Sequence, residues 1–277
     1  MRFVKRKPYP SDLTDPQWKK LAPHIPPAHG RGAPRRVDMR DIINALRYLA
    51  RTGCQWRFLP HDLPPWEIVY YYFSQWRDDG SWEQINRDLG IEIRVNVGKD
   101  PEPSAGILDS QSVKSTEMSE TRGYDAGKKV TGIKRHTLVD TLGLVIKVVV
   151  LAANIQDRDG ARTLLEKLKG KLPRLKIIWA DGGYQGALLD WVKQVCDWIL
   201  TIVKRSDTAK GFQVLPHRWI VERTFGWLNR YRRLSKNYER LPASSEAMVY
   251  LAMITLMTKR LANELTCFAD SLTLLIE

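Results

Sequence analysis

Two β-branched segments on either side of a tight turn constrain the fold more than any other feature of the chain. The runs GIKRHTLVD (132–140) and GLVIKVVVLAA (143–153) flank DTLG, in which Gly143 suits a left-handed turn position, so a β-hairpin is predicted. Other short apolar runs alternate with amphipathic segments, namely strands at 105–109, 175–181 and 198–205 and helices at 157–170 and 182–197. This alternation predicts an α/β fold, with a mixed sheet flanked by helices.

The first hundred residues have a different, helical pattern. Segments at 14–25, 38–53, 64–80 and 81–90 are predicted as helices, with Thr14 and Ser81 as caps and Gly53 at the end of the second. The stretch 90–106 is rich in Pro and Gly, which places a domain boundary near residue 100. Residues 1–100 are therefore predicted to form a small all-helical domain. Its helix count suits a helix-turn-helix-like DNA-binding module and equally a bundle that only packs on its neighbour.

The charge balance favours a polyanionic partner. The net charge is +13, and residues 1–40 and 204–240 each hold ten Lys or Arg against three acids. Two basic segments suit two contacts with a phosphate backbone, although a merely solvated basic face fits either one alone. Three isolated cysteines favour a reduced, cytosolic protein, and no segment predicts a signal peptide or a membrane span.

Two aspartates directly follow apolar strand runs. Asp109 follows GIL and Asp181 follows KIIWA, and functional groups gather at the carboxyl ends of strands in open α/β sheets. If the two strands are neighbours, the carboxylates face one another and favour a hard cation such as Mg²⁺ or Mn²⁺. Either residue alone also fits an ordinary turn or cap.

A third acid stands alone in a basic helical segment. The stretch HRWIVERTFGWLNRYRRL (217–234), predicted as one helix, contains five arginines and the single acid Glu222. An i,i+4 pair with Arg218 would contribute only a few tenths of a kcal/mol. Together with the two aspartates, Glu222 instead suggests a three-carboxylate site for two metal ions, the arrangement used in phosphodiester chemistry. Arg218 and its neighbours would then hold the scissile strand.

Four blocks resemble those of bacterial insertion-sequence transposases of the DDE class, in the group typified by insertion sequence five. The blocks are GILDSQSVK, GIKRHTLVDTLGLV, IIWADGGYQG and HRWIVERTFGWLNRYRRLSKNYE, and the helical N-terminal segments resemble that group as well. Around the last acid the superfamily has a Tyr-x2-Arg-x3-Glu-x6-Lys pattern. Arg218 and Glu222 match this pattern, whereas Leu215 and Asn229 depart from it.

The resemblance implies a ribonuclease-H-like catalytic domain over residues 101–277. It places the catalytic and metal-binding triad on Asp109, Asp181 and Glu222, with two Mg²⁺ or Mn²⁺ ions. Its expected partners are double-stranded DNA, as terminal inverted repeats and target, and a second copy of the chain. The residues expected to contact DNA are Arg218, Arg223, Arg230, Arg232, Arg233, Lys134, His136 and Lys114.

Three functions fit these residues. The first is a transposase that cuts the element ends by metal-dependent hydrolysis and joins the 3′-hydroxyls to target DNA. The second is a ribonuclease-H-like nuclease that cuts without joining, and the third is a non-catalytic, domesticated DNA-binding regulator. A strand-transfer product separates the first from the second, and metal-dependent cleavage separates both from the third.

Overall fold

The computed structural model describes residues 6–28, 35–203 and 217–262. Its strands are β1 (Ala105–Lys114), β2 (Gly123–Asp125), β3 (Val130–Asp140), β4 (Val145–Ala152), β5 (Ile177–Ala180) and β6 (Ile199–Ile202). Its α-helices are α1 (Asp15–Leu21), α2 (Met39–Thr52), α3 (Trp66–Asp78), α4 (Ser81–Asn96), α5 (Asp157–Glu166), α6 (Leu188–Cys196), α7 (Arg218–Asn229), α8 (Arg232–Ser235) and α9 (Pro242–Ala262). Short 3-10 helices are η1 (Ala22–His24), η2 (Trp56–Phe58) and η3 (Gly182–Tyr184).

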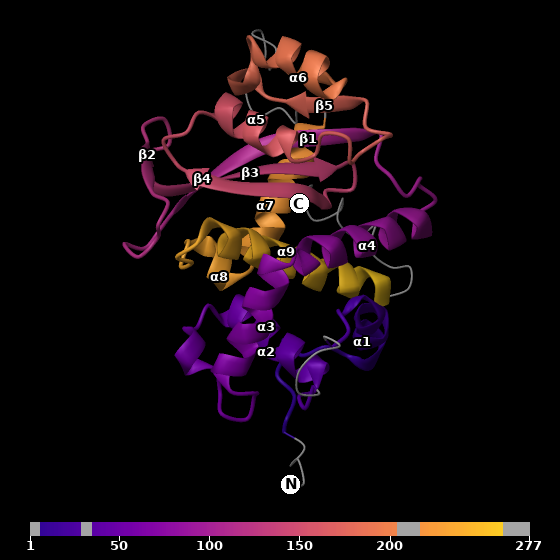
Figure 1. Ribbon diagram of the computed structural model, residues 1–277, viewed down its shortest axis with the longest axis vertical. Coiled ribbons are helices and arrows are strands. Elements are labelled where there is room, and N and C mark those ends of the chain that lie inside the picture. Colours follow the sequence, from indigo (N-terminus) through magenta and orange to yellow (C-terminus); the bar gives the residue numbers. More distant parts are fainter. Residues whose placement is uncertain (1–5, 29–34, 204–216, 263–277) are drawn as a thin grey trace, which may run out of the picture.

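The strands form one mixed sheet. β3 lies antiparallel between β1 on one side and β4 and the short β2 on the other, and β5 and β6 continue the sheet parallel to β1. Helices α5 and α6 cover one face, and α7, α9 and α4 lie against the other (Figure 1). This is the predicted ribonuclease-H-like arrangement, so the predicted fold class is confirmed.

The hairpin between β3 and β4 forms as the sequence predicts. Gly143 has φ +78°, and the Asp140 carboxylate accepts hydrogen bonds from the backbone N–H groups of Leu142 and Leu144. The turn also contacts α7, because a Cβ on Gly143 would come within 2.8 Å of the Thr224 hydroxyl. Glycine is therefore required at this position both for the backbone conformation and for the close approach.

The helical boundaries differ from the prediction at three places. Gly80, and not Ser81, precedes α4 as its cap, with φ +80°. The predicted linker 90–106 is helical up to Asn96, so the connection to the sheet is shorter. The predicted helix 217–234 breaks after Asn229, because Tyr231 adopts an extended backbone with its ring buried and Arg51 donates to the Arg230 carbonyl.

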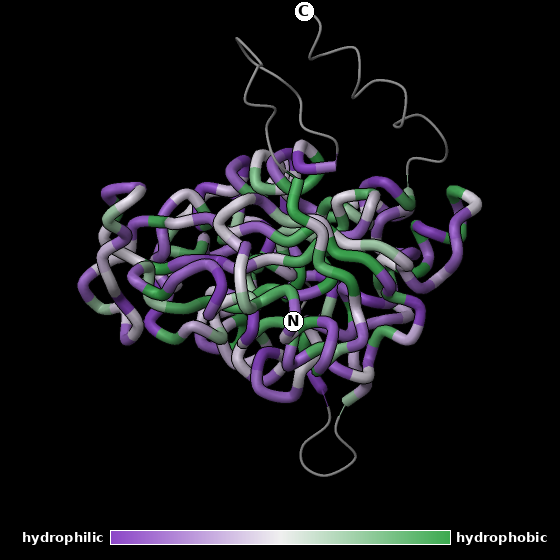
Figure 2. The backbone as a smooth tube through the Cα atoms, turned by 90° about the horizontal axis from the view of Figure 1, so that it is seen from above, coloured by the Kyte–Doolittle hydropathy of each residue, from purple (hydrophilic) through white to green (hydrophobic). Residues whose placement is uncertain are grey.

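A continuous hydrophobic core joins the N-terminal helices to the rest of the molecule. Helix α9 contacts α1, α2, α3 and α4 as well as β4, and its buried residues occupy most of its circumference. A second core lies between the sheet and the α5–α6 layer. Hydrophobic segments run through the middle of the molecule, and hydrophilic segments dominate its outer loops (Figure 2). Helix α9 therefore packs inside this core, while independent domains at 1–100 and 101–277 stay a prediction.

Candidate active site

Asp109 and Asp181 reach the same level of two neighbouring parallel strands. The last paired residues of β1 and β5 are Ile107 and Trp179, and each aspartate follows two residues later, Asp181 directly after the end of β5. The sequence predicted Asp109 at a strand end, but the residue lies in the middle of β1. The strand is longer than predicted because β3 pairs with β1 as far as Lys114. The expected pairing of the two acids therefore arises from register.

The environment of Asp109 disfavours its charged form. Burial raises the pKa of Asp109 to about 6, and the nearby charge of Asp181 acts in the same direction. A hydrogen bond of 2.7 Å from the Ser110 N–H, together with the charges of Arg218 and Lys128, opposes this rise. A cation at this place would therefore meet a carboxylate whose negative charge is poorly compensated.

Asp181 caps a turn and also faces α7. Its Oδ1 accepts a hydrogen bond of 2.8 Å from the Gly183 N–H, as an Asp before a short helix commonly does. Its Oδ2 lies 3.5 Å from the Arg218 guanidinium, which lies 3.5 Å from Glu222 on the same helix. Arg218 therefore forms the Arg–Glu helix pair and also links Glu222 to Asp181.

A stacked aromatic pair holds the start of α7 against the end of β5. The rings of Trp179 and His217 lie parallel, with their centroids 3.9 Å apart. Trp179 comes two residues before Asp181, and His217 directly precedes Arg218. This contact was not predicted, although a Trp within the otherwise aliphatic run IIWA was a visible signal.

The fit of these acids to metal ions is partial in this arrangement. Oxygen ligands from carboxylates suit Mg²⁺ or Mn²⁺, and Asp181 is close enough to Asp109 for its charge to raise the pKa of Asp109. Glu222, with its side chain 57% exposed, stands on the other side of Arg218. Within the described part of the chain, no three Asp, Glu, His or Cys side chains gather closely enough to hold a metal ion.

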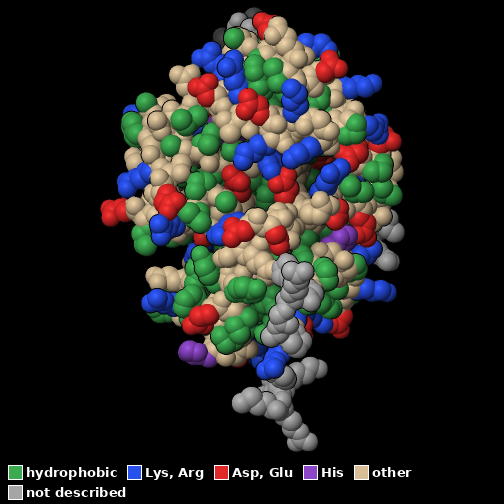
Figure 3. Space-filling view, viewed as in Figure 1, with side chains coloured by type: hydrophobic (Ala, Val, Ile, Leu, Met, Phe, Trp, Pro, Cys, Tyr) green, Lys and Arg blue, Asp and Glu red, His purple; other side chains and the backbone are tan. Residues whose placement is uncertain are grey.

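Three of the predicted DNA-contacting residues are exposed. They are Lys114 at the end of β1, Arg230 after α7, and Arg232 at the start of α8. On the face shown in Figure 3, Lys and Arg side chains are interspersed with Asp and Glu. Asn229, which departs from the family pattern, accepts a 3.3 Å hydrogen bond from Gln111, and Leu215 lies outside the described residues.

Arg223 is partly exposed and contacts neighbouring side chains of the protein, and its predicted DNA contact stays a prediction. Its guanidinium lies over the rings of Trp219 and Trp227, at 4.6 and 4.7 Å from their centroids, and donates to the Leu142 carbonyl. Burial lowers the pKa of Arg223. The side chain therefore ties α7 to the β3–β4 turn.

Arg233 is likewise buried, at 6% side-chain exposure. It donates to Glu239 at 2.7 Å and to the Cys54 carbonyl at 2.9 Å, which fixes α8 against the segment after α2. Because its hydrogen bonds point into the protein, the prediction that Arg233 contacts DNA is corrected.

Lys134 and His136 are also in the interior. The Lys134 ammonium lies 3.1 Å from Asp157 and 3.4 Å from Asp125, and it donates to the Ile155 carbonyl. His136 is fully buried beneath α5, and burial lowers its pKa to about 4. Helix α5 covers this face of β3, so the predicted phosphate contacts of both residues are corrected.

A polar network behind Asp109 was missed from sequence. The Ser110 hydroxyl donates to Asp157 at 2.8 Å, and Asp157 pairs with the buried Lys134. The buried Tyr184 lies close enough for Asp109, Asp157 and Asp181 to raise its pKa, although burial is the larger cause. Only the fold brings these residues together, since they come from β1, β3, α5 and η3.

The strand order and the position of the acids define a protein of the ribonuclease-H-like class. A family model described as "Transposase DDE domain" matches residues 100–257, and one described as "Putative transposase of IS4/5 family" matches residues 13–86. The chain therefore belongs to the DDE transposases of the IS4/5 family.

Two curated relatives are similar to parts of the chain. The "Putative transposase for insertion sequence element IS402" of Burkholderia cepacia is 30% identical over 121 residues, covering 39% of this chain and 54% of the relative. The "Uncharacterized protein y4sN" of Sinorhizobium fredii is 30% identical over 81 residues, covering 29% of this chain and 64% of the relative. The chain thus spans between half and two thirds of the length of these relatives.

No solved structure matches the chain. Among the helices of the described ranges, none combines the length and the apolar character needed to cross a membrane.

Proposed function

We propose that this transposase binds the terminal inverted repeats of its element, cuts the DNA at the ends and joins the freed 3′-hydroxyls to target DNA. Asp109, Asp181 and Glu222 are the proposed catalytic acids. The observation that carries the proposal is the matched register of Asp109 and Asp181, with Arg218 3.5 Å from both Asp181 and Glu222. Two ends must be brought together, so two copies of the chain are proposed to act in one DNA complex.

The proposed cofactors are two Mg²⁺ or Mn²⁺ ions held by the three acids. When bound, they would supply an activated water or 3′-hydroxyl and stabilise the leaving oxygen. Asp109 and Asp181 fit this role through their donor chemistry and their mutual proximity. Glu222 joins them from α7, whose start is held against β5 by the stacking of Trp179 on His217.

The remaining residues position the acids and the DNA strand. The Ser110 N–H orients one oxygen of Asp109, and the Gly183 N–H orients one oxygen of Asp181. Arg218 presents a cation between two acids, where it can pair with a scissile phosphate and offset the charge that develops during the reaction. The exposed Lys114, Arg230 and Arg232 are proposed to hold the flanking backbone.

The test uses DNA that carries the element's own ends. Asp181→Asn and Glu222→Gln proteins are expected to bind this DNA as the wild type does, but to form neither nicked nor joined product with Mn²⁺. Asp190→Asn, which alters an exposed acid on α6, is the matched control and should retain both activities.

Wild-type rates of cleavage in both active-site variants would overturn the assignment of the acids. Cleavage by the wild type with no strand-transfer product would reduce the function to that of a nuclease. Binding with no metal-dependent cleavage would support a non-catalytic regulator.

A further inference from the structure

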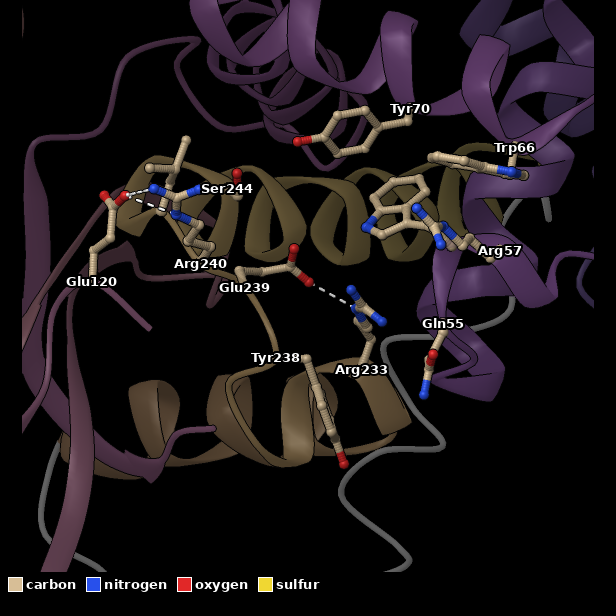
Figure 4. A pocket seen from close by; sticks show the side chains of 12 residues that line it. Gln55, Arg57, Trp66, Tyr70, Glu120, Arg233, Tyr238, Glu239, Arg240 and Ser244 are labelled. Carbon is tan, nitrogen blue, oxygen red and sulfur yellow. Dashed lines mark hydrogen bonds and ion pairs between the residues drawn. The ribbon is translucent and has the colours of Figure 1, made fainter. Parts of the chain in front are cut away.

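A cavity of about 650 Å³ lies away from the acids, between the N-terminal helices and the segment that joins α8 to α9. Trp66 and Tyr70 of α3 line one side, and Tyr238 and Arg233 line the other (Figure 4). Trp56 of η2 also lines the cavity. Its volume falls within the range of small-molecule sites. Neither the triad nor the predicted DNA contacts account for this concentration of aromatic side chains.

The aromatic rings of this cavity remain accessible. Tyr70 is 40% exposed and Tyr238 is 41% exposed. The rings of Tyr70 and Trp56 meet in a T-shaped contact, with their centroids 5.0 Å apart. Accessible ring faces at a cavity wall suit another planar ring, such as a nucleobase.

The charges around the cavity favour an anion. Arg233 pairs with Glu239 at 2.7 Å, and Arg240 pairs with Glu120 at 2.8 Å, so each carboxylate already has its own guanidinium. Arg57 lies over the Trp66 ring, 5.6 Å from its centroid, and its side chain is exposed. Arg57 is therefore the cation of the lining that is placed to bind a phosphate, and it lies next to the Trp66 ring.

The cavity is connected to the proposed active site through β1. Asp109 lies in the middle of this strand, and five residues further on, Lys114 accepts a hydrogen bond from the Asn237 N–H, directly before Tyr238. Five residues of strand span about 17 Å. A DNA strand held at Asp109 covers that distance in roughly five stacked nucleotides.

We propose that this cavity binds an unpaired nucleotide of DNA, with its base against the aromatic side chains and its phosphate on Arg57. The inference rests on the proposed function, since it assumes that DNA is the substrate. Bases inside a duplex have their faces covered by their neighbours, so only an unstacked nucleotide can use these rings.

The experiment compares single-stranded with duplex DNA on the full chain, with EDTA present to prevent cleavage. The probes are a labelled ten-nucleotide oligothymidylate and a labelled duplex carrying the element end. Tyr70→Ala and Trp66→Ala should weaken oligothymidylate binding about tenfold and change duplex binding less than about twofold. Tyr71→Ala and Phe58→Ala, which remove exposed aromatic side chains outside the cavity lining, are the matched controls and should leave both affinities unchanged.

Arg57→Gln provides a second test that does not depend on the packing of an aromatic residue. The Arg57 side chain is exposed, so the variant should fold as the wild type does. It should bind oligothymidylate more weakly, and the salt dependence of its binding constant should fall by about one released ion. Unchanged binding in Arg57→Gln, or equal losses in Tyr70→Ala and Tyr71→Ala, would overturn the inference.

Other outcomes separate the two proposals. A wild type that binds the duplex but not the oligothymidylate would overturn the cavity inference and leave the proposed function intact. A wild type that binds neither probe would overturn both.

Discussion

The indole of Trp179 stacks on the imidazole of His217 with centroids 3.9 Å apart, and so joins two segments that carry different acids. Trp179 belongs to β5, which leads to Asp181, and His217 precedes α7, which carries Glu222. The contact fixes the start of α7 beside the end of β5, directly before Asp181. The distance between the second and third acids therefore depends on this ring pair.

Trp179→Leu should slow cleavage about 10- to 100-fold, because a small displacement of a catalytic group has a large effect on rate. Trp179→Phe keeps a planar ring and should restore most of the activity. The measurement is cleavage of element-end DNA, with the thermal midpoint recorded for each variant. Equal activity of the Leu and Phe variants would contradict the positioning role.

Arg218→Gln should slow cleavage about 10- to 100-fold, because the cation between Asp181 and Glu222 is lost. Binding of Mn²⁺, measured by calorimetry, should not weaken, since the change removes a positive charge beside the acids. Weaker Mn²⁺ binding together with slower cleavage would instead indicate that Arg218 holds the acids in place.

Arg94→Ala should destabilise the fold by about 3–5 kcal/mol, because it leaves Asp140 as a buried, unpaired carboxylate. Arg94 of α4 lies 2.6 Å from Asp140, which also caps the β3–β4 turn. Arg87→Ala breaks the more exposed pair with Glu102 on the same helix and should cost less than about 1 kcal/mol. Urea denaturation measures both, and similar losses would contradict the prediction.

Gly160→Ala should destabilise the fold by about 1–3 kcal/mol through overpacking. A Cβ at Gly160 of α5 would lie 2.1 Å from the ring of the fully buried His136. Gly90→Ala is the matched control, because a Cβ there meets nothing within 4 Å, and it should stabilise α4 by about 0.5–1 kcal/mol. Thermal unfolding of the two variants should therefore shift in opposite directions.

His136 should make the protein less stable in acid. Burial lowers the pKa of His136 to about 4, whereas the pKa in an unfolded chain is about 6.5. As the pH falls, the unfolded state therefore binds a proton at a higher pH than the folded state does. Stability from the neutral ring is fully present above pH 6.5 and is lost as the pH falls from 6.5 towards 4, by about 3 kcal/mol. The free energy of unfolding of His136→Gln should fall less over this range. Parallel pH profiles of the two proteins would contradict this assignment.

Local sequence patterns determined much of this architecture. The alternation of β-branched and amphipathic segments predicted the mixed sheet, and DTLG predicted the turn in which Gly143 adopts positive φ. The Thr14 cap and the Gly53 helix end also followed from local rules. These features could be predicted because their causes lie within a few residues of each other.

The environments of the charged side chains were decided by tertiary structure. In the sequence, Lys134 and Arg233 look like phosphate-binding residues, yet both are buried. Lys134 pairs with Asp157, and Arg233 pairs with Glu239. Whether a cation faces solvent depends on which element packs over it, and a single strand or helix does not specify that.

The arrangement of the three acids shows the same division. The sequence alone determined which acids follow strand runs or stand in a basic helix, and so identified Asp109, Asp181 and Glu222 as candidates. Only the tertiary structure decided that Asp109 and Asp181 share a register and that Glu222 meets them across Arg218. The physical reason is that strand pairing and the stacking of Trp179 on His217 act between segments far apart in the chain, where no local pattern records them.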